Sequence, residues 1–292
     1  MYLKKFKSAI PTSVKRAIWR GLRLQKALTG HIRLMPDFII IGAQRCGTTT
    51  LYNHLKRHPC CVPADEKEIH FFDINFKKGT TWYRTHFPSF LHKCYIEYMY
   101  KQSFITGEAS PYYFFHPHAP RRIFETVPSV KLILLLRNPV DRAYSHYHHL
   151  VRGGTETLSS FEEAIEKEEQ RLYGEVEKML ADENYSSFNH RYYSYLARGI
   201  YIDQLKVWMD YCTRGQILVL KSEDFYNDTP TVFKRVLEFL NLPSQELEEY
   251  KIYNSANNPK METATRKRLI DYFEPHNQRL YEYLGIDFDW DK

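Results

Sequence analysis

The sequence predicts an α/β fold of the P-loop type: a three-layer α/β/α domain with a central, mostly parallel sheet, a helical insertion and C-terminal helices. Two observations predict this class. Apolar runs of strand length alternate with helical patterns along most of the chain, and this order builds parallel sheets with helices on both faces. The first apolar run also enters a loop between two glycines and then a helix, as phosphate-binding units do.

The first strand and the loop after it carry the most information. Apolar residues 38–41 stop at Gly42, and a tight loop reaches Gly47 before a helical pattern begins. This spacing matches the start of the nucleotide P-loop, G-x-x-x-x-G-K-[ST], but Thr48 occupies the lysine position. A cation appears inside the loop instead, as Arg45. We therefore predict a loop that binds a phosphate, although not the γ-phosphate of ATP with its magnesium.

The alternation of strands and helices continues to the C-terminus. Strands are expected at 104–108, 131–136 and 216–220. Helices are expected at 117–126, 140–150, 160–181, 200–211, 229–241 and 262–284. Ligands of such folds bind at the C-terminal ends of the strands.

The strand at 131–136 ends in Arg137, where ATP-binding P-loop proteins place an aspartate that helps to hold the metal. A cation at the end of a central strand suits a second phosphate instead. The sequence thus offers two anion sites, at Arg45 and at Arg137. A nucleoside with phosphates at both ends fits them, and the sulfuryl donor adenosine 3′-phosphate 5′-phosphosulfate (PAPS) is such a ligand.

Three separated patterns resemble the PAPS-dependent sulfotransferases, and most closely the heparan (glycan) type and the related bacterial branch. The patterns are the loop at 41–49, the segment KEIHFFD at 67–73 and the segment LRNPVDRAYSHY at 136–147. Their order and spacing agree with the family over roughly residues 37–285. The resemblance implies transfer of a sulfuryl group from PAPS to a hydroxyl or amine of a glycan, a glycolipid or a small molecule.

The resemblance also implies roles for single residues. Arg45 stands where the family usually has a lysine that bridges the 5′-phosphate and the sulfuryl group. Arg137 and Ser145 would bind the 3′-phosphate of the donor. The rest of the loop would bind the 5′ end through backbone and hydroxyl groups, and these residues are Cys46, Gly47, Thr48, Thr49 and Thr50. The glycan enzymes also carry a late disulfide-linked loop near the nucleotide, but no cysteine follows Cys212 here, and Asn258 and Lys260 are the candidates for late contacts.

The chemistry requires a base for the acceptor and a cation for the leaving oxygen. Glu68 falls where the glycan branch places its general base, with His70 and Asp73 nearby in support. His70 is the alternative base, because imidazole has this role in the small-molecule branch. Arg45 is the candidate cation at the leaving oxygen. Nothing in this chemistry requires a metal.

Other interpretations of these residues stay open. Arg137 can pair with Asp141 at the start of a helix, Ser145 can face solvent, and Glu68 with His70 can be surface residues at a strand end.

The rival functions are a P-loop kinase or other nucleotide phosphotransferase, and an inactive nucleotide-binding scaffold at a membrane. The aromatic and basic segment 188–195, at the end of an insertion at 152–198, either borders the acceptor cleft or belongs to a packed helix hairpin.

Composition and charge place the chain among globular enzymes. The 292 residues are 43% hydrophobic and 26% charged, which favours one catalytic domain at 37–292 after a basic arm at 1–36. The arm holds nine cations and no acid, and the rest holds 32 cations against 35 acids. The positive charge therefore does not indicate nucleic-acid binding by the body. Five cysteines without a framework, and no signal or membrane-spanning segment, predict a bacterial cytoplasmic enzyme.

The arm itself predicts an amphipathic helix from Val14 to about Gly30, with cations on one side and apolar residues on the other. Two interpretations remain for this helix. It lies on an anionic membrane surface, through residues 1–34, or it covers part of the catalytic body.

Overall fold

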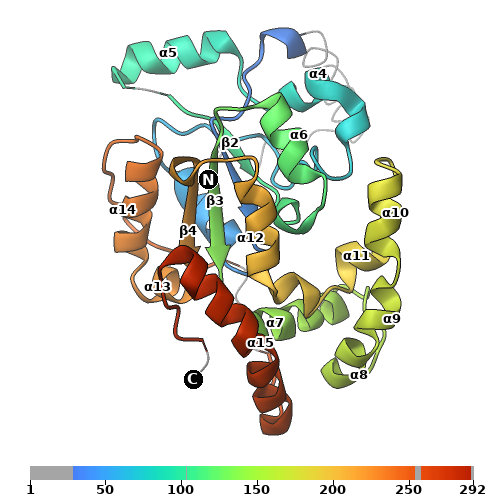
Figure 1. The fold of residues 1–292 in the computed structure, drawn as a ribbon. Coiled ribbons are helices and arrows are strands. Elements are labelled where there is room, and N and C mark those ends of the chain that lie inside the picture. Colours follow the sequence, from blue (N-terminus) through green and yellow to red (C-terminus); the bar gives the residue numbers. More distant parts are fainter. Residues whose placement is uncertain (1–28, 103, 254–257, 291–292) are drawn as a thin grey trace, which may run out of the picture.

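The computed structural model describes residues 29–102, 104–253 and 258–290, and the helix predicted in the arm lies outside these residues. Its centre is a sheet of four parallel strands in the order β2-β1-β3-β4. The strands are β1 (Phe38–Gly42), β2 (Gly107–Ala109), β3 (Lys131–Leu136) and β4 (Ile217–Lys221). This arrangement confirms the predicted α/β class with a parallel sheet (Figure 1).

The two central strands are apolar along their length because both of their faces are covered. Every residue of β1 is buried, and so is all of β3 after Lys131. Strands β1 and β3 are direct neighbours, with Ile39 paired to Leu132 and Ile40 to Ile133. The two loops predicted to bind phosphate therefore leave the same edge of the sheet side by side.

The strand expected at 104–108 was misplaced, because β2 pairs only over Gly107–Ala109. The chain before it is held by Asp37 instead. The backbone N–H of Asp37 donates to the carbonyl of Thr106 at 2.7 Å, and the Asp37 carboxylate accepts from the N–H of Thr106 at 2.8 Å. These bonds use the groups that a longer strand would pair.

Helices cover both faces of the sheet. Figure 1 shows α12 and α15 crossing the near side, while α3, in blue, lies on the far side. The helices around the sheet are α3 (Thr48–Leu55), α4 (Gly79–Arg84), α5 (Phe90–Tyr100), α6 (Ala119–Thr126), α7 (Pro139–Arg152), α12 (Tyr201–Met209), α13 (Ser222–Asn227), α14 (Thr229–Phe239) and α15 (Thr263–Leu284). The sequence pattern predicted all of these except α4, α5 and α13. No helix among the described residues is long and apolar enough to cross a membrane.

The insertion corrects one prediction. Instead of a single acidic helix at 160–181, the chain forms three short helices, α8 (Phe161–Glu166), α9 (Glu168–Leu172) and α10 (Glu175–Ala181), followed by α11 (Phe188–Tyr192). Gly174 interrupts the run with a left-handed φ of 71°. The buried carboxylate of Glu168 accepts from the backbone N–H groups of Leu196 and Ala197, which holds α9 against the end of the insertion.

Candidate active site

A cavity of about 550 Å³ opens at the C-terminal ends of the central strands. Its walls come from the loop after β1, the start of α7 after β3, and α13 after β4. Seven of the residues predicted for the site line it: Arg45, Gly47, Thr48, Thr49, Glu68, Arg137 and Ser145. Glu68 lies on the same wall as its neighbour Lys67. The fold therefore brings most of the predicted residues into one place.

The loop after β1 turns sharply into the start of a helix. Arg45 and Gly47 have left-handed φ values of 71° and 93°, and α3 begins at Thr48 without a side-chain cap. A side chain at position 47 would also meet the hydroxyl of Tyr226 at 2.9 Å. The first N–H groups of a helix find no partner inside the helix, and together with its dipole they favour an anion.

Two predicted loop residues turn away from the cavity. Cys46 is fully buried, and its carbonyl accepts from the hydroxyl of Ser222 at 2.7 Å. The side chain of Thr50 is also buried and exchanges hydrogen bonds with the backbone of Tyr253, at 3.1 and 3.4 Å. Neither side chain can bind a ligand in the cavity, so any role of these two residues would fall to their backbone.

The two predicted cations lie next to each other. Arg45 donates from Nε to the Ser145 hydroxyl at 3.1 Å, and Arg137 donates to the carbonyl of Arg45 at 3.4 Å. Burial lowers the pKa of Arg45, and the charges of Arg152 and Arg137 lower it further. This crowding of like charge favours an anion between the arginines. Ser145 thus faces the site and not the solvent.

The acids of the cavity are engaged elsewhere. Asp141 pairs with Arg266 at 2.5 Å, so the alternative Asp141–Arg137 ion pair does not form. Glu223 accepts from the backbone N–H of Asn138 at 2.8 Å. Among the described residues, neither Arg45 nor Arg137 has a carboxylate partner. Both guanidinium groups remain available to a ligand, which fits a donor with phosphates at two ends.

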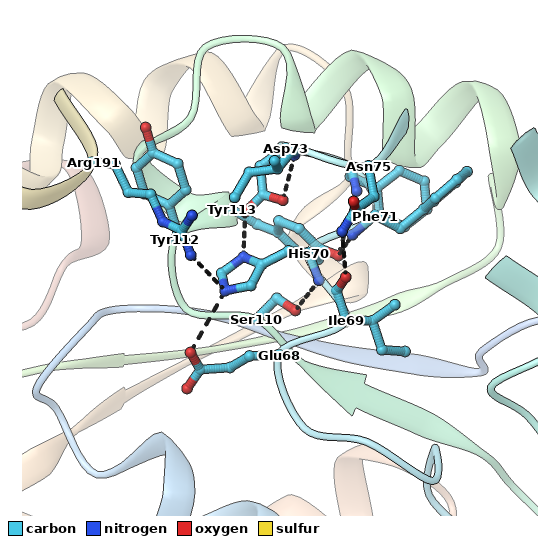
Figure 2. A network of polar contacts seen from close by, with 12 residues as sticks. Glu68, Ile69, His70, Phe71, Asp73, Asn75, Ser110, Tyr112, Tyr113 and Arg191 are labelled. Atoms are coloured by element: carbon cyan, nitrogen blue, oxygen red, sulfur yellow. Dashed lines mark hydrogen bonds and ion pairs between the residues drawn. The ribbon is translucent and has the colours of Figure 1, made fainter. Parts of the chain in front are cut away.

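Figure 2 shows the acid–base segment as a network around His70. Its Nδ1 lies 2.7 Å from a carboxylate oxygen of Asp73, and its Nε2 lies 3.6 Å from a carboxylate oxygen of Glu68. The guanidinium of Arg191, from the insertion, lies 3.4 Å from the same Nε2. Lys67 forms an ion pair with the other oxygen of Glu68. Two carboxylates and the guanidinium of Arg191 thus surround the imidazole, and Lys67 contacts Glu68 alone.

The network sets the charge of both candidate bases. Burial opposes ionisation of Glu68, but its contacts with His70 and Lys67 prevail and lower its pKa to about 2. Burial likewise opposes charge on His70, but Asp73 and Glu68 raise its pKa to about 9. At neutral pH Glu68 is therefore ionised and His70 is protonated. A protonated imidazole cannot accept a proton, so this arrangement disfavours His70 as the base.

The three candidate catalytic residues share an unusual backbone conformation. Arg45, Glu68 and His70 have φ values of 71°, 62° and 54°. Only three other non-glycine residues in the described part of the chain have positive φ. Such conformations cost about 1–3 kcal/mol each and gather at functional sites, where the surrounding structure imposes them.

A buried carboxyl group is linked by hydrogen bonds to the backbone of the acid–base segment. Glu108, on β2, accepts hydrogen bonds from Tyr83 at 2.6 Å, Ser110 at 2.7 Å and Tyr113 at 3.0 Å. The Tyr113 hydroxyl in turn accepts from the backbone N–H of Phe71 at 2.8 Å. No sequence motif had indicated this role. A charged residue inside an otherwise apolar strand was the signal that pointed to it.

Arg198 connects the phosphate loop to the insertion, and the sequence analysis missed it too. It is fully buried and donates to the side chain of Gln44 in the loop. It also donates to the carbonyls of His190 at 3.1 Å and Arg191 at 2.8 Å. The end of the insertion therefore borders the site through Arg191, while His190 packs inside, stacked on Phe115.

The two residues predicted to contact the nucleotide from the C-terminal part of the chain lie at the rim of the cavity. Asn258 lines the cavity and accepts from Arg152 at 2.8 Å. Lys260 lines an adjoining cavity of about 430 Å³, which Arg137 also borders. Tyr226, from α13, is a further wall residue that no motif indicated. In the part of the chain that the structure describes, no cluster of His, Cys, Asp and Glu is arranged to hold a metal.

Comparison with known proteins gives one consistent result. A family model described as a sulfotransferase domain matches residues 35–292. The membrane-associated sulfotransferase kil1 of Dictyostelium discoideum is 26% identical over 89% of this chain and 68% of its own length. Heparan sulfate glucosamine 3-O-sulfotransferase 5 of Homo sapiens is 28% identical over 94% of this chain and 82% of its own. A solved sulfotransferase from Alicyclobacillus acidocaldarius matches with a TM-score of 0.67 and 30% identity, covering 89% of this chain and all of that one.

Proposed function

The chain belongs to the sulfotransferase domain family and is a sulfotransferase, and we propose that residues 37–292 form one domain whose cavity holds PAPS between Arg45 and Arg137. Family membership implies PAPS as the donor. The observation that carries the proposed location is the pair of arginines without carboxylate partners among the described residues, beside an uncapped helix start. Such a site favours phosphate groups over neutral ligands.

In this proposal the loop residues Gly47, Thr48 and Thr49 bind the 5′ end of the donor, and Arg137 with Ser145 binds the 3′-phosphate. Asn258 and Lys260 are the proposed late contacts. Arg45 has to leave Ser145 and turn toward the leaving oxygen, because its proposed task is to stabilise charge that develops there. We propose no role for a metal, since cationic side chains already line the cavity.

Glu68 is the proposed general base. The acceptor oxygen or nitrogen forms a bond to sulfur while the bond from sulfur to the bridging 5′-phosphate oxygen breaks, and its electrons stay on that oxygen. The proton of the acceptor passes to Glu68. A pKa of about 2 makes Glu68 a weak base in the resting arrangement. Lys67 lines the cavity, and drawing it from Glu68 toward the bound donor would raise the basicity of the carboxylate.

We propose a glycan as the acceptor. Relatives named as heparan sulfate sulfotransferases support this class. The cationic side chains of Lys67 and Arg191, near Glu68 and His70, also favour an acceptor that carries negative charge. Sulfate transfer from labelled PAPS to a panel of glycans, glycolipids, phenols and amines tests this proposal. Transfer to phenols alone would contradict it.

Calorimetry tests the donor site directly. Adenosine 3′,5′-bisphosphate, the product of PAPS, should bind in the presence of a metal chelator. Tighter binding of magnesium–ATP would instead favour the kinase alternative, for which the described site offers no specific support. Binding of adenosine 3′,5′-bisphosphate without sulfate transfer to any acceptor of the panel would favour the inactive-scaffold alternative.

We also propose that the enzyme works in a bacterial cytoplasm, with residues 1–34 in contact with a membrane. Five free cysteines and the bacterial structural relative support the compartment. The relative named as membrane-associated supports the contact. Fractionation of cells that produce the full chain tests both: the enzyme should sediment with membranes and be released by salt.

A further inference from the structure

Helix α5 presents its apolar side to solvent. None of its residues is buried. Five of them follow the spacing i, i+3, i+4, i+7 and i+8, and all five are exposed; we call this set the apolar stripe, and it consists of Leu91, Cys94, Tyr95, Tyr98 and Met99. A helix of a globular protein normally turns such a stripe toward the core. Here the largest exposed fractions are 73% for Leu91 and 70% for Tyr98.

The opposite side of α5, with Lys93, Ile96 and Glu97, is partly buried. Ser89 caps the helix by accepting from the N–H of His92 at 3.3 Å. Glu97 accepts from the backbone N–H of Phe104 at 3.3 Å and lies 3.8 Å from Lys93. The bond from Phe104 to Glu97 ties the inner side of the helix to the chain that follows it, and the apolar stripe faces outward.

The sequence segments that adjoin α5 are rich in cations. Residues 77–101 hold five cations and one acid, and residues 1–36 hold nine cations and no acid. The structure joins the two segments, because Arg33 forms a β-bridge with Ser89 and the N–H of Leu34 donates to the carbonyl of Pro88 at 3.0 Å. The other residues of the chain carry 27 cations and 34 acids. The excess of positive charge is therefore concentrated in two segments of the sequence, and the described end of the first, residues 29–36, lies beside the start of α5.

We propose that α5, together with the adjoining residues 29–36 and 77–89, docks on an anionic lipid surface. The apolar stripe would enter the interfacial region while the surrounding cations meet the headgroups. Tyrosines suit this boundary because each has an apolar ring and a polar tip. Lys101, stacked over the ring of Tyr98 at 4.2 Å, is placed to reach headgroups at the end of the helix.

Charge argues against the two other occupants of the stripe. The charged residues of the arm are all cations, so covering α5 with it would place like charges beside Lys101. A second copy of this chain would bring two cationic edges face to face. An anionic lipid surface is the partner that the charges complement.

Helix α5 lies away from the catalytic cavity. Figure 1 shows α5 at the end of the sheet opposite α7 and α13, which border the cavity. Docking through α5 therefore leaves the cavity open to solvent. The inference is independent of the proposed catalytic roles, because no residue of α5 lines the cavity.

The native cysteines allow a direct test on the full chain. Cys94 lies in the apolar stripe and is exposed, whereas Cys46, Cys60, Cys61 and Cys212 are buried. A polarity-sensitive dye on Cys94 should report water in buffer and with phosphatidylcholine vesicles. It should shift to an apolar signal when the vesicles contain phosphatidylserine, and added salt should reverse the shift. No shift with phosphatidylserine would overturn the proposal.

Matched variants identify the surface. The double variant Leu91→Ser/Tyr98→Ser should lower sedimentation with phosphatidylserine vesicles by about tenfold or more, since it removes two large apolar side chains. The control Tyr173→Ser/Leu180→Ser changes similar side chains, 86% and 58% exposed, on the insertion and should bind as the original chain does. Binding is compared at a temperature where circular dichroism shows both variants folded.

Three results would refute docking on lipid through α5. The first is equal vesicle binding by the α5 double variant and the control. The second is a dye that is already in an apolar environment in buffer and becomes exposed when residues 1–28 are removed, because the arm would then cover the stripe. The third is a dimer in light scattering that the α5 double variant abolishes, because the stripe would then bind a second copy.

Discussion

The charges of Glu68 and His70 depend on each other, and this coupling decides which of them can accept a proton. In isolation an imidazole is the better base near neutral pH. The contacts of His70 with Asp73 and Glu68 keep it protonated, with a pKa of about 9. The carboxylate is therefore the group with a free lone pair, and the imidazolium holds it in place at 3.6 Å.

The first prediction concerns the base. Glu68→Gln should lower turnover by about 10²–10⁴-fold, the usual contribution of a general base, and leave the affinity for adenosine 3′,5′-bisphosphate nearly unchanged. Single-turnover kinetics and calorimetry measure the two effects. A larger loss in His70→Ala, or turnover that rises as the pH passes 9, would move the base to His70.

The second prediction concerns pH and stability. The pKa of His70 is raised from 6.5 to about 9 in the folded state, so its protonation stabilises the fold fully below pH 6.5. This contribution is lost as the pH rises through 9. The difference in unfolding free energy between the original chain and His70→Gln should therefore shrink across this window in denaturant titrations. A difference that stays constant would show that His70 is neutral in the folded protein.

The third prediction concerns the donor. Arg137→Ala should weaken the binding of adenosine 3′,5′-bisphosphate by about 1.5–3 kcal/mol, the scale of a hydrogen bond to a charged group. Arg279→Ala is the control, because this exposed arginine pairs with Asp203, and neither residue lines the cavity. Calorimetry should show a much smaller loss for the control. An unchanged affinity of the Arg137 variant would remove that residue from the site.

At the scale of elements, the turn from β1 into α3 shows how a loop is shaped around its ligand. Gly47 combines a left-handed φ with close contact to Tyr226, so two constraints act on one residue. Arg45 accepts the same kind of backbone strain two residues earlier. The buried Arg198 fixes Gln44 beside them and ties the turn to the insertion.

The fourth prediction separates these constraints. Gly47→Ala should lower the unfolding free energy by about 1–2 kcal/mol from the left-handed backbone alone, and should also weaken donor binding because the added methyl group displaces Tyr226. Gly174→Ala is a matched control, with a φ of 71° and no atom within 4 Å of the added group. The control should lose similar stability and keep its donor affinity. Equal donor affinities in the two variants would contradict this account of the turn.

At the scale of the whole molecule, positive charge is concentrated in residues 1–36 and 77–101, while the other residues carry 27 cations and 34 acids. The fifth prediction uses two truncations. Residues 29–34 bind the body, through Arg33 to the carbonyl of Phe87 at 2.6 Å and Leu34 to Pro88 at 3.0 Å. Removal of residues 1–28 should therefore leave the melting temperature unchanged and weaken salt-sensitive binding to anionic vesicles. Removal of 1–34 should lower the melting temperature by several degrees, as calorimetry can measure. A large loss of stability in the shorter truncation would mean that the arm belongs to the fold.

The sequence alone determined the fold class, the central strands and the main cations of the site. These features are local: a strand buried on both faces is apolar throughout, as in β1 and β3, and a phosphate loop has fixed glycine spacing. The segment with Glu68 and His70 was found through its resemblance to the sulfotransferase family. Each of these motifs consists of residues that are neighbours in the sequence, so it can be recognised without knowledge of the fold.

The tertiary structure decided how those residues are used. Glu108 and Arg198 support the site through partners that lie far away in the sequence, up to 154 positions from Arg198 to Gln44. Only packing showed that Thr50 turns inward while Thr48 lines the cavity, and that α5 turns its apolar stripe outward. Charge states followed from distances, such as the 2.7 Å between His70 and Asp73. Local patterns encode chemistry and periodicity, but burial and pKa values depend on which distant side chains the fold brings together.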